Sequence, residues 1–266
     1  MRVMKTRPIL ALLAAVMAAG AGASPAAARV IELGAPSTAP VVAPTCPPGV
    51  SAANCTIILT QVTALETIRA DVAYPTTVTR AGYVVAFTLG LSQLNTNRSK
   101  ALQAIKFLNS AYGGAAAAAI TVLKPVGSKR LRHWQVAGES PAYHLSQYLG
   151  EVVQFPLATA LRVVPGETIA LTVPTWAPVL SFNLPLKSYA YRQSRSTGCI
   201  SPAATSQAQT VVGAPDVAYN CNYAGTRVEY TATEVTSPLP ACPTSTGTTK
   251  TKTKAPSTPC TKITST

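Results

Sequence analysis

Acidic residues and histidines are scarce in this sequence. Its 266 residues include nine Asp and Glu residues and two histidines, against 22 Lys and Arg residues. Hydrolysis of a glycosidic bond usually requires two carboxyl groups about 5–10 Å apart. No short motif places two carboxylates on one face of a strand, and Glu229 and Glu234, five positions apart, would point to opposite faces. The sequence therefore does not predict a glycosidase.

Sequence motifs of several other chemistries are missing as well. The chain has no G-x-S-x-G nucleophile elbow, no glycine-rich phosphate loop, no dinucleotide-binding fingerprint and no EF-hand spacing. The cysteines lack C-x2-C spacing, and ten residues separate His133 from His144, so neither set predicts a zinc site. We predict no metal site and no cofactor, although calcium held by backbone carbonyls would leave no pattern in the sequence.

The first 28 residues have the order of a secretory signal peptide. Arg2, Lys5 and Arg7 precede the apolar run ILALLAAVMAAGAGA, and small residues then lead to SPAAA, which ends near Ala28. The alternative is an uncleaved N-terminal anchor, but a membrane span takes roughly 20 strongly apolar residues. We therefore expect a secreted, extracellular protein, with association with the cell wall as a further expectation.

Six cysteines remain after this segment, an even number that favours disulfides in an exported chain. Six cysteines allow 15 pairings. Proximity in the sequence favours Cys46–Cys55, Cys199–Cys221 and Cys242–Cys260. An oxidised cysteine cannot attack a substrate, so no nucleophilic thiol is predicted.

Composition divides the remaining chain into three parts. Residues 29–56 are rich in Pro, Ala, Val and Thr and are predicted to be a spacer. Residues 57–236 have the length of a single ordered domain. Residues 237–266 are mostly Thr, Pro, Ser and Lys, a composition that cannot bury apolar surface and predicts a disordered basic tail.

The net charge of +13 is distributed rather than concentrated. Residues 30–240 contain 14 basic and nine acidic residues, and the segment from Ala241 onward adds four lysines and no acid. Outside the cell the anionic partners would be wall polymers or surface phosphates rather than nucleic acid. The alternative is that the charge serves solubility alone.

Alternation of apolar and polar residues predicts strands through most of the domain. It places Val85, Phe87, Leu89 and Leu91 on one face of a strand, and Ile169, Leu171 and Val173 on another. In the last strand Val228, Tyr230 and Ala232 are predicted to be buried, with Arg227, Glu229, Thr231 and Thr233 facing out. We predict an all-β fold, an antiparallel β-sandwich of jelly-roll type.

One helix is predicted near residues 97–110. Asn97 is a good N-cap, Gly113-Gly114 form the stop, and the apolar residues between them have helical spacing. These apolar residues are Leu102, Ile105, Leu108 and Tyr112.

Four segments, GGAAAAAITVLKP, SPAYHLSQYLG, VVPGETIALTVPTWAP and YRQSRSTGC, occur in this order. Through them the chain resembles a group of uncharacterised secreted bacterial proteins that look like single jelly-roll or β-sandwich domains. The resemblance spans roughly Tyr83 to Glu234. It implies this fold and an exported location, and it carries over no activity and no catalytic residue.

The basic run SKRLRHW is the most distinctive local feature. On a strand Arg130, Arg132 and Trp134 would share one face, where guanidinium groups pair with anions and an indole can stack on a sugar ring. The alternative is a solvated strand end, with Trp134 anchoring the core. Arg192 and Arg195 form a second basic pair, which would contact an anion or hold loop carbonyls near a disulfide.

Trp176 lies between two prolines, directly after the strand ETIALTV. Most tryptophans are largely buried, which favours a position in the core or at its rim. The alternative is a ligand platform, so we include Trp176 with Arg130, Arg132 and Trp134 as candidate ligand-binding residues.

Three functions remain open at this stage. The first is a non-catalytic cell-envelope or glycan-binding module, whose partner would be a polysaccharide or an anionic cell-wall polymer. The second is a lyase acting on acidic polysaccharide, with His133, Arg132 and Tyr143 as candidates. The third is a purely structural envelope protein. A concave face lined with Arg, Trp and Tyr would favour the first two, and burial of both tryptophans would favour the third.

Overall fold

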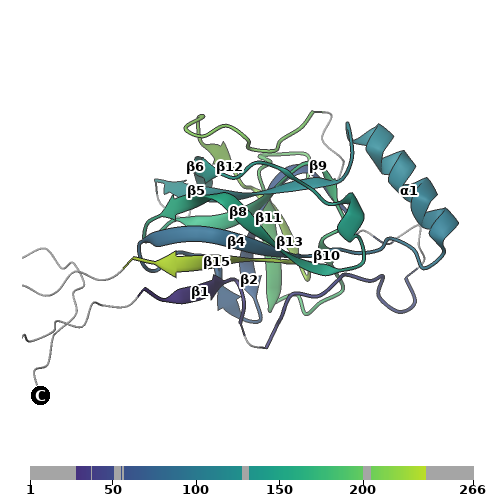
Figure 1. The fold of residues 1–266 in the computed structure, drawn as a ribbon, viewed down its shortest axis with the longest axis horizontal. Coiled ribbons are helices and arrows are strands. Elements are labelled where there is room, and N and C mark those ends of the chain that lie inside the picture. Colours follow the sequence, from purple (N-terminus) through teal and green to yellow (C-terminus); the bar gives the residue numbers. More distant parts are fainter. Residues whose placement is uncertain are drawn as a thin grey trace, which may run out of the picture. The chain divides into compact units, whose positions relative to one another are not determined.

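Two antiparallel sheets and one α-helix account for most of the described chain (Figure 1). The computed structural model describes residues 28–36, 38–50, 55, 57–127, 132–199 and 205–237. The predicted all-β class and antiparallel sandwich are confirmed. The strands are Val30–Leu33 (β1), Leu59–Arg69 (β2), Val72–Ala73 (β3), Gly82–Gly90 (β4), Ala117–Val126 (β5), His133–Glu139 (β6), Tyr143–His144 (β7), Val152–Val163 (β8), Thr168–Ala177 (β9), Leu180–Ser181 (β10), Tyr189–Gln193 (β11), Val217–Ala218 (β12), Cys221–Ala224 (β13), Arg227–Val228 (β14) and Tyr230–Thr236 (β15).

The smaller sheet has the strand order β1-β15-β4-β8. The larger sheet has the order β12-β6-β5-β9-β2-β11-β13, with β3 paired to β2 and β7 paired to β5, and β10 and β14 form a separate pair. The main core contains apolar side chains from both sheets. Phe87, Leu89 and Tyr230 come from the smaller sheet, and Ile120 and Leu171 come from the larger one.

The predicted inward positions are largely confirmed. Ile169, Leu171 and Val173 are fully buried in the main core. In β4, however, Val84 is buried in place of Val85. A bulge between Val84 and Ala86 shifts the register against β8, and such an irregularity changes which side chains face the core.

The positions predicted to face solvent are mostly wrong, and on the larger sheet the reason is a second apolar cluster that covers its other face. Ala170 and Thr172 of β9 are buried, and Ala170 belongs to this second apolar cluster, formed with Leu65, Leu123, Trp134, Val136 and Tyr219. Arg227, Glu229 and Thr231 are buried as well. Strict alternation identifies the two faces of a strand, but it does not show that the second face is exposed to solvent.

The helix agrees closely with its prediction. α1 spans Arg98–Ala111, and the side chain of Asn97 accepts a hydrogen bond from the backbone N–H of Lys100 at 3.1 Å. Leu108 is buried and Ile105 is partly buried against the main core, whereas Leu102 is exposed, contrary to the predicted apolar face. A single 3-10 turn, η3, spans Ser146–Tyr148. No helix in the described part of the chain is long and apolar enough to cross a membrane.

Residues 29–56 are not merely a spacer, which corrects the predicted domain boundary. β1 pairs with β15, and the N–H of Arg29 donates to Thr236 Oγ1 at 3.0 Å, while the N–H of Thr236 donates to the carbonyl of Arg29 at 2.8 Å. Leu33 and Ala39 are buried. The apolar residues of this segment therefore complete the smaller sheet. Residues 1–27 and 238–266, which include the predicted signal peptide and tail, lie outside the described residues.

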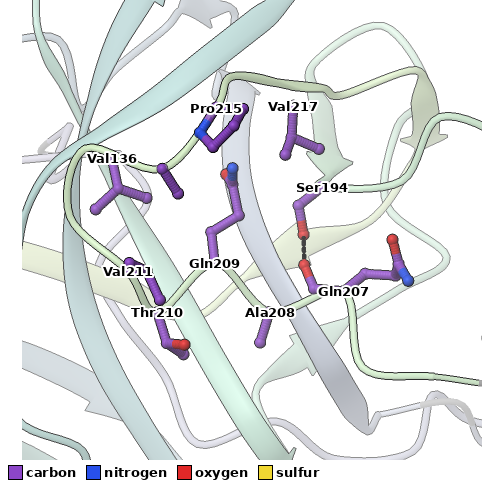
Figure 2. Close-up of a pocket in the computed structure, with 10 residues that line it drawn as sticks. Val136, Ser194, Gln207, Ala208, Gln209, Thr210, Val211, Pro215 and Val217 are labelled. Carbon is purple, nitrogen blue, oxygen red and sulfur yellow. Dashed lines mark hydrogen bonds between the residues drawn. The ribbon is translucent and has the colours of Figure 1, made fainter.

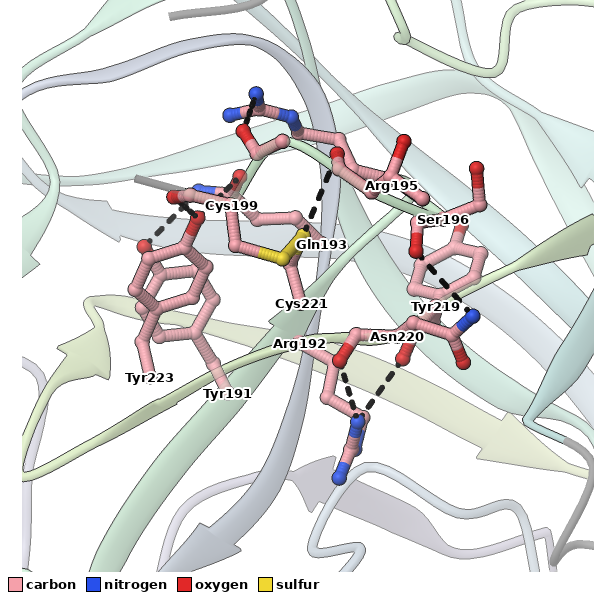
Figure 3. Close-up of a disulfide and its surroundings, with 12 residues drawn as sticks. Tyr191, Arg192, Gln193, Arg195, Ser196, Cys199, Tyr219, Asn220, Cys221 and Tyr223 are labelled. Carbon is pink, nitrogen blue, oxygen red and sulfur yellow. Dashed lines mark hydrogen bonds between the residues drawn. A yellow bond between two sulfur atoms is a disulfide. The ribbon is translucent and has the colours of Figure 1, made fainter. Parts of the chain in front are cut away.

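Two of the three predicted disulfides are confirmed. Cys46 is bonded to Cys55, and Cys199 is bonded to Cys221. Around the second bond, shown in Figure 3, the hydroxyl of Tyr223 donates to the carbonyl of Cys199 at 2.6 Å. Cys242 and Cys260 lie outside the described residues.

Candidate functional site

Both tryptophans proposed as ligand platforms are buried. Trp134 is 3% exposed and lies in the second apolar cluster, with its ring centroid 6.3 Å from that of Tyr74 and 6.5 Å from that of Tyr219. Val217 of β12 lies opposite it in the sheet. An indole in this position cannot stack on a sugar ring, so the binding role predicted for Trp134 is wrong and its role as a core anchor is supported.

Trp176 has no exposed surface. Its Nε1–H lies 3.0 Å from Asn109 Oδ1 and 3.1 Å from the carbonyl oxygen of Gly114, both of which accept a hydrogen bond. The side chain therefore joins the end of β9 to α1 and to the turn that follows it. The platform role predicted for Trp176 is also wrong, because a tryptophan with its N–H and both ring faces inside the protein has no surface left for a ligand.

Arg132 and Arg192, here called the cationic pair, both bond to the backbone of Tyr219, Arg132 through its carbonyl and Arg192 through its guanidinium group. Arg132 is exposed and immediately precedes β6, and its carbonyl accepts from the N–H of Tyr219 at 2.8 Å. A guanidinium nitrogen of Arg192, in β11, donates to the carbonyls of Tyr219 at 3.1 Å and Asn220 at 3.2 Å, as Figure 3 shows. Burial lowers the pKa of Arg192, and the nearby charge of Arg132 lowers it further.

The backbone next to this pair has an unusual conformation. Arg132 and Tyr74 both have positive φ, at 55° and 47°, a region that residues with side chains rarely adopt. Such geometry persists only where the surrounding fold enforces it. Arg130, the remaining candidate of this run, lies outside the described residues.

Arg195, the second member of the basic pair in YRQSRSTGC, is buried. Its guanidinium donates to the carbonyl of Gly198, one residue before the bonded Cys199 (Figure 3). The structural alternative, in which these arginines hold loop carbonyls near a disulfide, therefore describes Arg195. It also describes the carbonyl contacts of Arg192.

The residues proposed for a lyase do not converge. His133 lies opposite Val126 of β5, whereas Tyr143 lies opposite Ala118 of the same strand. Eight residues of a β-strand span about 26 Å. The hydroxyl of Tyr143 also donates to the carbonyl of Pro156 at 2.8 Å. A lyase site built from His133, Arg132 and Tyr143 is therefore wrong, because the strand geometry keeps Tyr143 away from the other two.

His133 instead pairs with Asp216. Its Nδ1 lies 2.6 Å from Asp216 Oδ2, and both side chains are substantially exposed, at 42% and 37%. A carboxylate can orient an imidazole for proton transfer, but a catalytic role also requires a substrate-binding recess at this point. Two recesses are lined in part by residues between Gln207 and Val217, and neither His133 nor Asp216 is among their lining residues. The pair is best described as a surface hydrogen bond that joins β6 to the segment before β12.

Sequence reasoning missed a buried network of four ionisable side chains. Arg69 Nη1 lies 3.2 Å from Glu66 Oε2, and an Arg227 guanidinium nitrogen lies 2.5 Å from Glu229 Oε2. Arg69 also donates to the carbonyl of Ala39 at 3.1 Å, and Arg227 donates to that of Pro40. The network holds residues 39–42 against the sheets, because the N–H of Val42 donates to Glu229 at 3.2 Å.

Burial governs the electrostatics of this network. It raises the pKa of Glu66 to about 8, although the charges of Arg69 and Arg227 act in the opposite direction. Burial likewise raises the pKa of Glu229, against the opposing charge of Arg227. Buried ion pairs are costly to desolvate, and breaking one by removing a single partner is strongly destabilising. These groups are enclosed, so a substrate cannot reach them, and their hydrogen bonds to the carbonyls of Ala39 and Pro40 hold that segment in place.

Two recesses flank the segment that covers the larger sheet, residues 205–216. One, of about 240 Å³, is shown in Figure 2, where the Gln209 side chain points toward Pro215 and the Ser194 hydroxyl donates to the carbonyl of Gln207. The other, of about 390 Å³, contains Glu139 and Ser140. Burial raises the pKa of Glu139 to about 7. Neither recess was predicted, because its walls come from segments far apart in the sequence.

Within the described residues, no group of three or more His, Cys, Asp or Glu side chains is arranged to hold a metal ion. No protein-family model, curated protein or solved structure matches the chain. The resemblance to secreted bacterial β-sandwich proteins therefore stays a prediction, and function has to be inferred from the geometry.

Proposed function

We propose that this chain is an exported, non-catalytic module of the cell envelope that binds anionic polymers through the cationic pair Arg132 and Arg192. The signal-like residues 1–28 and the two disulfides support export. The cationic pair carries the binding proposal. Two guanidinium groups close enough to lower the pKa of one of them repel each other, and an anion placed between them relieves that repulsion.

Arginine suits this role because its planar fork pairs with carboxylate and phosphate oxygens in a bidentate way. The carbonyls of Tyr219 and Asn220 hold Arg192 in place, so part of the ordering cost of binding is already met by the fold. Other cations of the sequence would add salt-sensitive attraction to an anionic wall. They are Lys129 and Arg130, which precede Arg132 in the sequence, and Lys250, Lys252, Lys254 and Lys262, which follow the domain in the sequence.

Sedimentation with an insoluble polyanion tests this proposal. Residues 29–266 would be mixed with cross-linked polygalacturonate, or with cellulose as an uncharged control, at low and high salt. Arg132→Gln should weaken binding to the polyanion by about three- to tenfold, as the loss of one interfacial charge of roughly 1 kcal/mol implies. Arg162→Gln removes another exposed charge from β8, on the other sheet, and should change binding by less than about twofold.

A chain ending at Ser237 separates the domain from its basic tail. If binding depends on the tail alone, or if Arg162→Gln weakens binding as much as Arg132→Gln, the cationic pair is not a binding site. Retained binding in the shortened chain, with the difference between the two arginine variants preserved, supports the proposal.

A purely structural envelope protein is the second candidate. Burial of both tryptophans favours it, because the side chains best suited to binding sugars are used inside the fold. This candidate predicts no saturable binding to any polysaccharide in the same assay. It also predicts that Arg132→Gln leaves every binding curve unchanged.

A further inference from the structure

The recess of about 390 Å³ lies at the far end of β6 from the cationic pair. Its walls include Ala119 of β5, Glu139 at the end of β6, Pro141, Pro174 of β9 and Val212 of the covering segment. Glu139 lies six residues from His133 along β6, which corresponds to about 20 Å. The recess is therefore separate from the proposed anion-binding pair. Its volume falls at the lower end of the range typical of small-ligand sites.

Glu139 supplies the one carboxyl group among the residues that line this recess. Its Oε2 has essentially no exposed surface and no hydrogen-bond partner. No described Lys or Arg side chain forms an ion pair with it. A buried polar atom without a partner is costly, and it needs a specific explanation in a folded protein.

Neighbouring hydroxyl groups are already used by the fold. The Ser140 hydroxyl accepts from the N–H of Ile120 at 3.0 Å and donates to the carbonyl of Pro141 at 3.0 Å. Thr121 lies opposite Glu139 in the sheet, and its Oγ1 is 2.5 Å from that of Thr172. These contacts leave the Glu139 carboxyl group as the one acidic acceptor among the residues that line the recess, beside the hydroxyl of Thr210.

The remaining walls determine which ligand suits this acceptor. Alanine, proline and valine side chains form most of the lining, Ser140 and Thr210 add hydroxyl groups, and no aromatic residue is among the lining residues. A ring that binds by stacking gains little from such walls, whereas an alkyl chain buries its surface well against them. Val212 is 57% exposed at the edge and extends the aliphatic surface outward.

We propose that this recess binds a primary ammonium group at the end of an aliphatic chain, with Glu139 as its counter-ion. The ammonium group pairs with the carboxyl group that lines the recess, and its charge offsets the cost of the partly buried carboxylate. Lysine side chains and aliphatic diamines share this chemistry. Burial raises the pKa of Glu139, so a bound cation should lower that pKa by favouring the ionised form.

Tyr219, whose own pKa Glu139 helps to raise, is the titratable neighbour from the covered side of the sheet. Burial is the main cause of the Tyr219 shift, and it keeps this phenol neutral over the pH range in which Glu139 titrates. The ammonium group of the ligand is therefore the charge that would alter the Glu139 titration.

Nuclear magnetic resonance with Nα-acetyl-L-lysine amide tests the inference on residues 29–266. The probe should produce saturable chemical-shift changes at Glu139, Ala142 and Val212. The norleucine analogue keeps the alkyl chain but lacks the ammonium group, and it should bind at least about tenfold more weakly. Equal binding of the two probes would show that the ammonium group is not recognised.

Glu139→Gln should weaken binding of the lysine probe at least about tenfold, while Glu151→Gln removes an exposed carboxyl group and should leave it unchanged. If Glu139→Gln fails to fold, the pKa of Glu139 can be measured in the unaltered chain instead. The Glu139 carboxyl resonance of the unaltered chain is titrated with and without the probe, and its pKa should fall when the probe is present. An unchanged pKa, or absence of saturable shifts, overturns the proposal. Binding to polygalacturonate should be unaffected by Glu139→Gln.

Discussion

At the scale of single residues, the charged side chains of this domain divide into enclosed and exposed groups. Glu66, Arg69, Arg227 and Glu229 are almost fully buried, whereas Arg132 is exposed. The enclosed arginines donate to backbone carbonyls as well as to carboxylates, so each one ties together segments distant in sequence. Their removal should affect stability, and removal of Arg132 should affect binding.

Arg69→Met tests the enclosed network. We expect the free energy of unfolding to fall by about 3–5 kcal/mol, because Glu66 loses its partner and the carbonyls of Ala39 and Tyr230 lose a donor. Urea denaturation measures this change. Arg162→Met, at an exposed position on β8, should change stability by less than about 0.5 kcal/mol.

The loss of stability caused by Arg69→Met should increase with pH. The pKa of Glu66 is about 8 in the folded protein and near 4.5 in an ordinary environment. The folded state therefore keeps a proton that the unfolded state releases, and stability decreases as pH rises between these values. Loss of the Arg69 charge raises the pKa of Glu66 further, so Arg69→Met should be more damaging at pH 9 than at pH 5. Equal losses at both pH values would contradict this account.

Glu139 provides a second pH-dependent prediction. Its pKa is raised to about 7 by burial, so its contribution to stability is present below about pH 4.5 and is lost as pH rises through 7. Glu139→Gln cannot ionise and should be more stable than the unaltered chain at pH 8, on the order of 1 kcal/mol because the side chain is only half-buried. Thermal melts at pH 4.5 and pH 8 check this, and the two proteins should melt alike at the lower pH.

At the scale of elements, one side chain of β9 hydrogen-bonds both to α1 and to the turn that follows it. Trp176 donates to Asn109 within the helix and to Gly114 just after it. Leu108 is the buried residue of the helix, which otherwise contributes half-buried and exposed side chains. A helix with so small a buried face is held mainly by tertiary contacts rather than by its own propensity.

Trp176→Phe retains an aromatic ring and removes both hydrogen bonds. We expect a loss of about 1–3 kcal/mol, because two partly buried acceptors lose their donor. Hydrogen exchange should show faster exchange in Arg98–Ala111 than in β5 and β9. Trp134→Phe alters the second apolar cluster instead, and it should leave exchange in α1 unchanged. Uniformly faster exchange in Trp176→Phe would indicate a general loss of stability rather than detachment of the helix.

At the scale of the whole molecule, the first described residues are part of the sandwich. β1 forms one edge of the smaller sheet, and the carbonyls of Ala39 and Pro40 accept from buried arginines. A chain that begins at Ile57 would lose both features. It would expose the edge of β15 and leave the two guanidinium groups with unsatisfied donors.

We expect residues 57–266 to lack the cooperative unfolding transition of residues 29–266. Circular dichroism during thermal denaturation measures this difference. A chain beginning at Ala28 and ending at Ser237 should unfold like the longer one, because the contacts that carry the fold lie between these residues. A cooperative transition with an unchanged midpoint in residues 57–266 would show that the N-terminal segment is dispensable.

The sequence was sufficient for features that depend on neighbouring residues. Alternation predicted the β class and the inward side chains of β9, Asn97 predicted the start of α1, and proximity predicted Cys46–Cys55 and Cys199–Cys221. The candidate site was predicted only in part. Arg132 is exposed as expected, but Arg192 is its partner in place of Trp134, since the backbone of Tyr219 joins the two arginines only in the folded chain.

Local patterns by themselves determined the strands, the helix cap and two disulfides, because each depends on backbone preferences or short chain separations. Tertiary structure alone decided that both tryptophans are buried, that residues 39–42 are clamped by Arg69 and Arg227, and that Glu139 lies unpaired in a recess. The physical reason is that a period of two marks two faces of a strand without saying what covers them. The segment that covers a strand can come from more than a hundred residues away in the sequence. Gln209 of the covering segment, for example, donates its backbone N–H to the hydroxyl of Thr63 in β2.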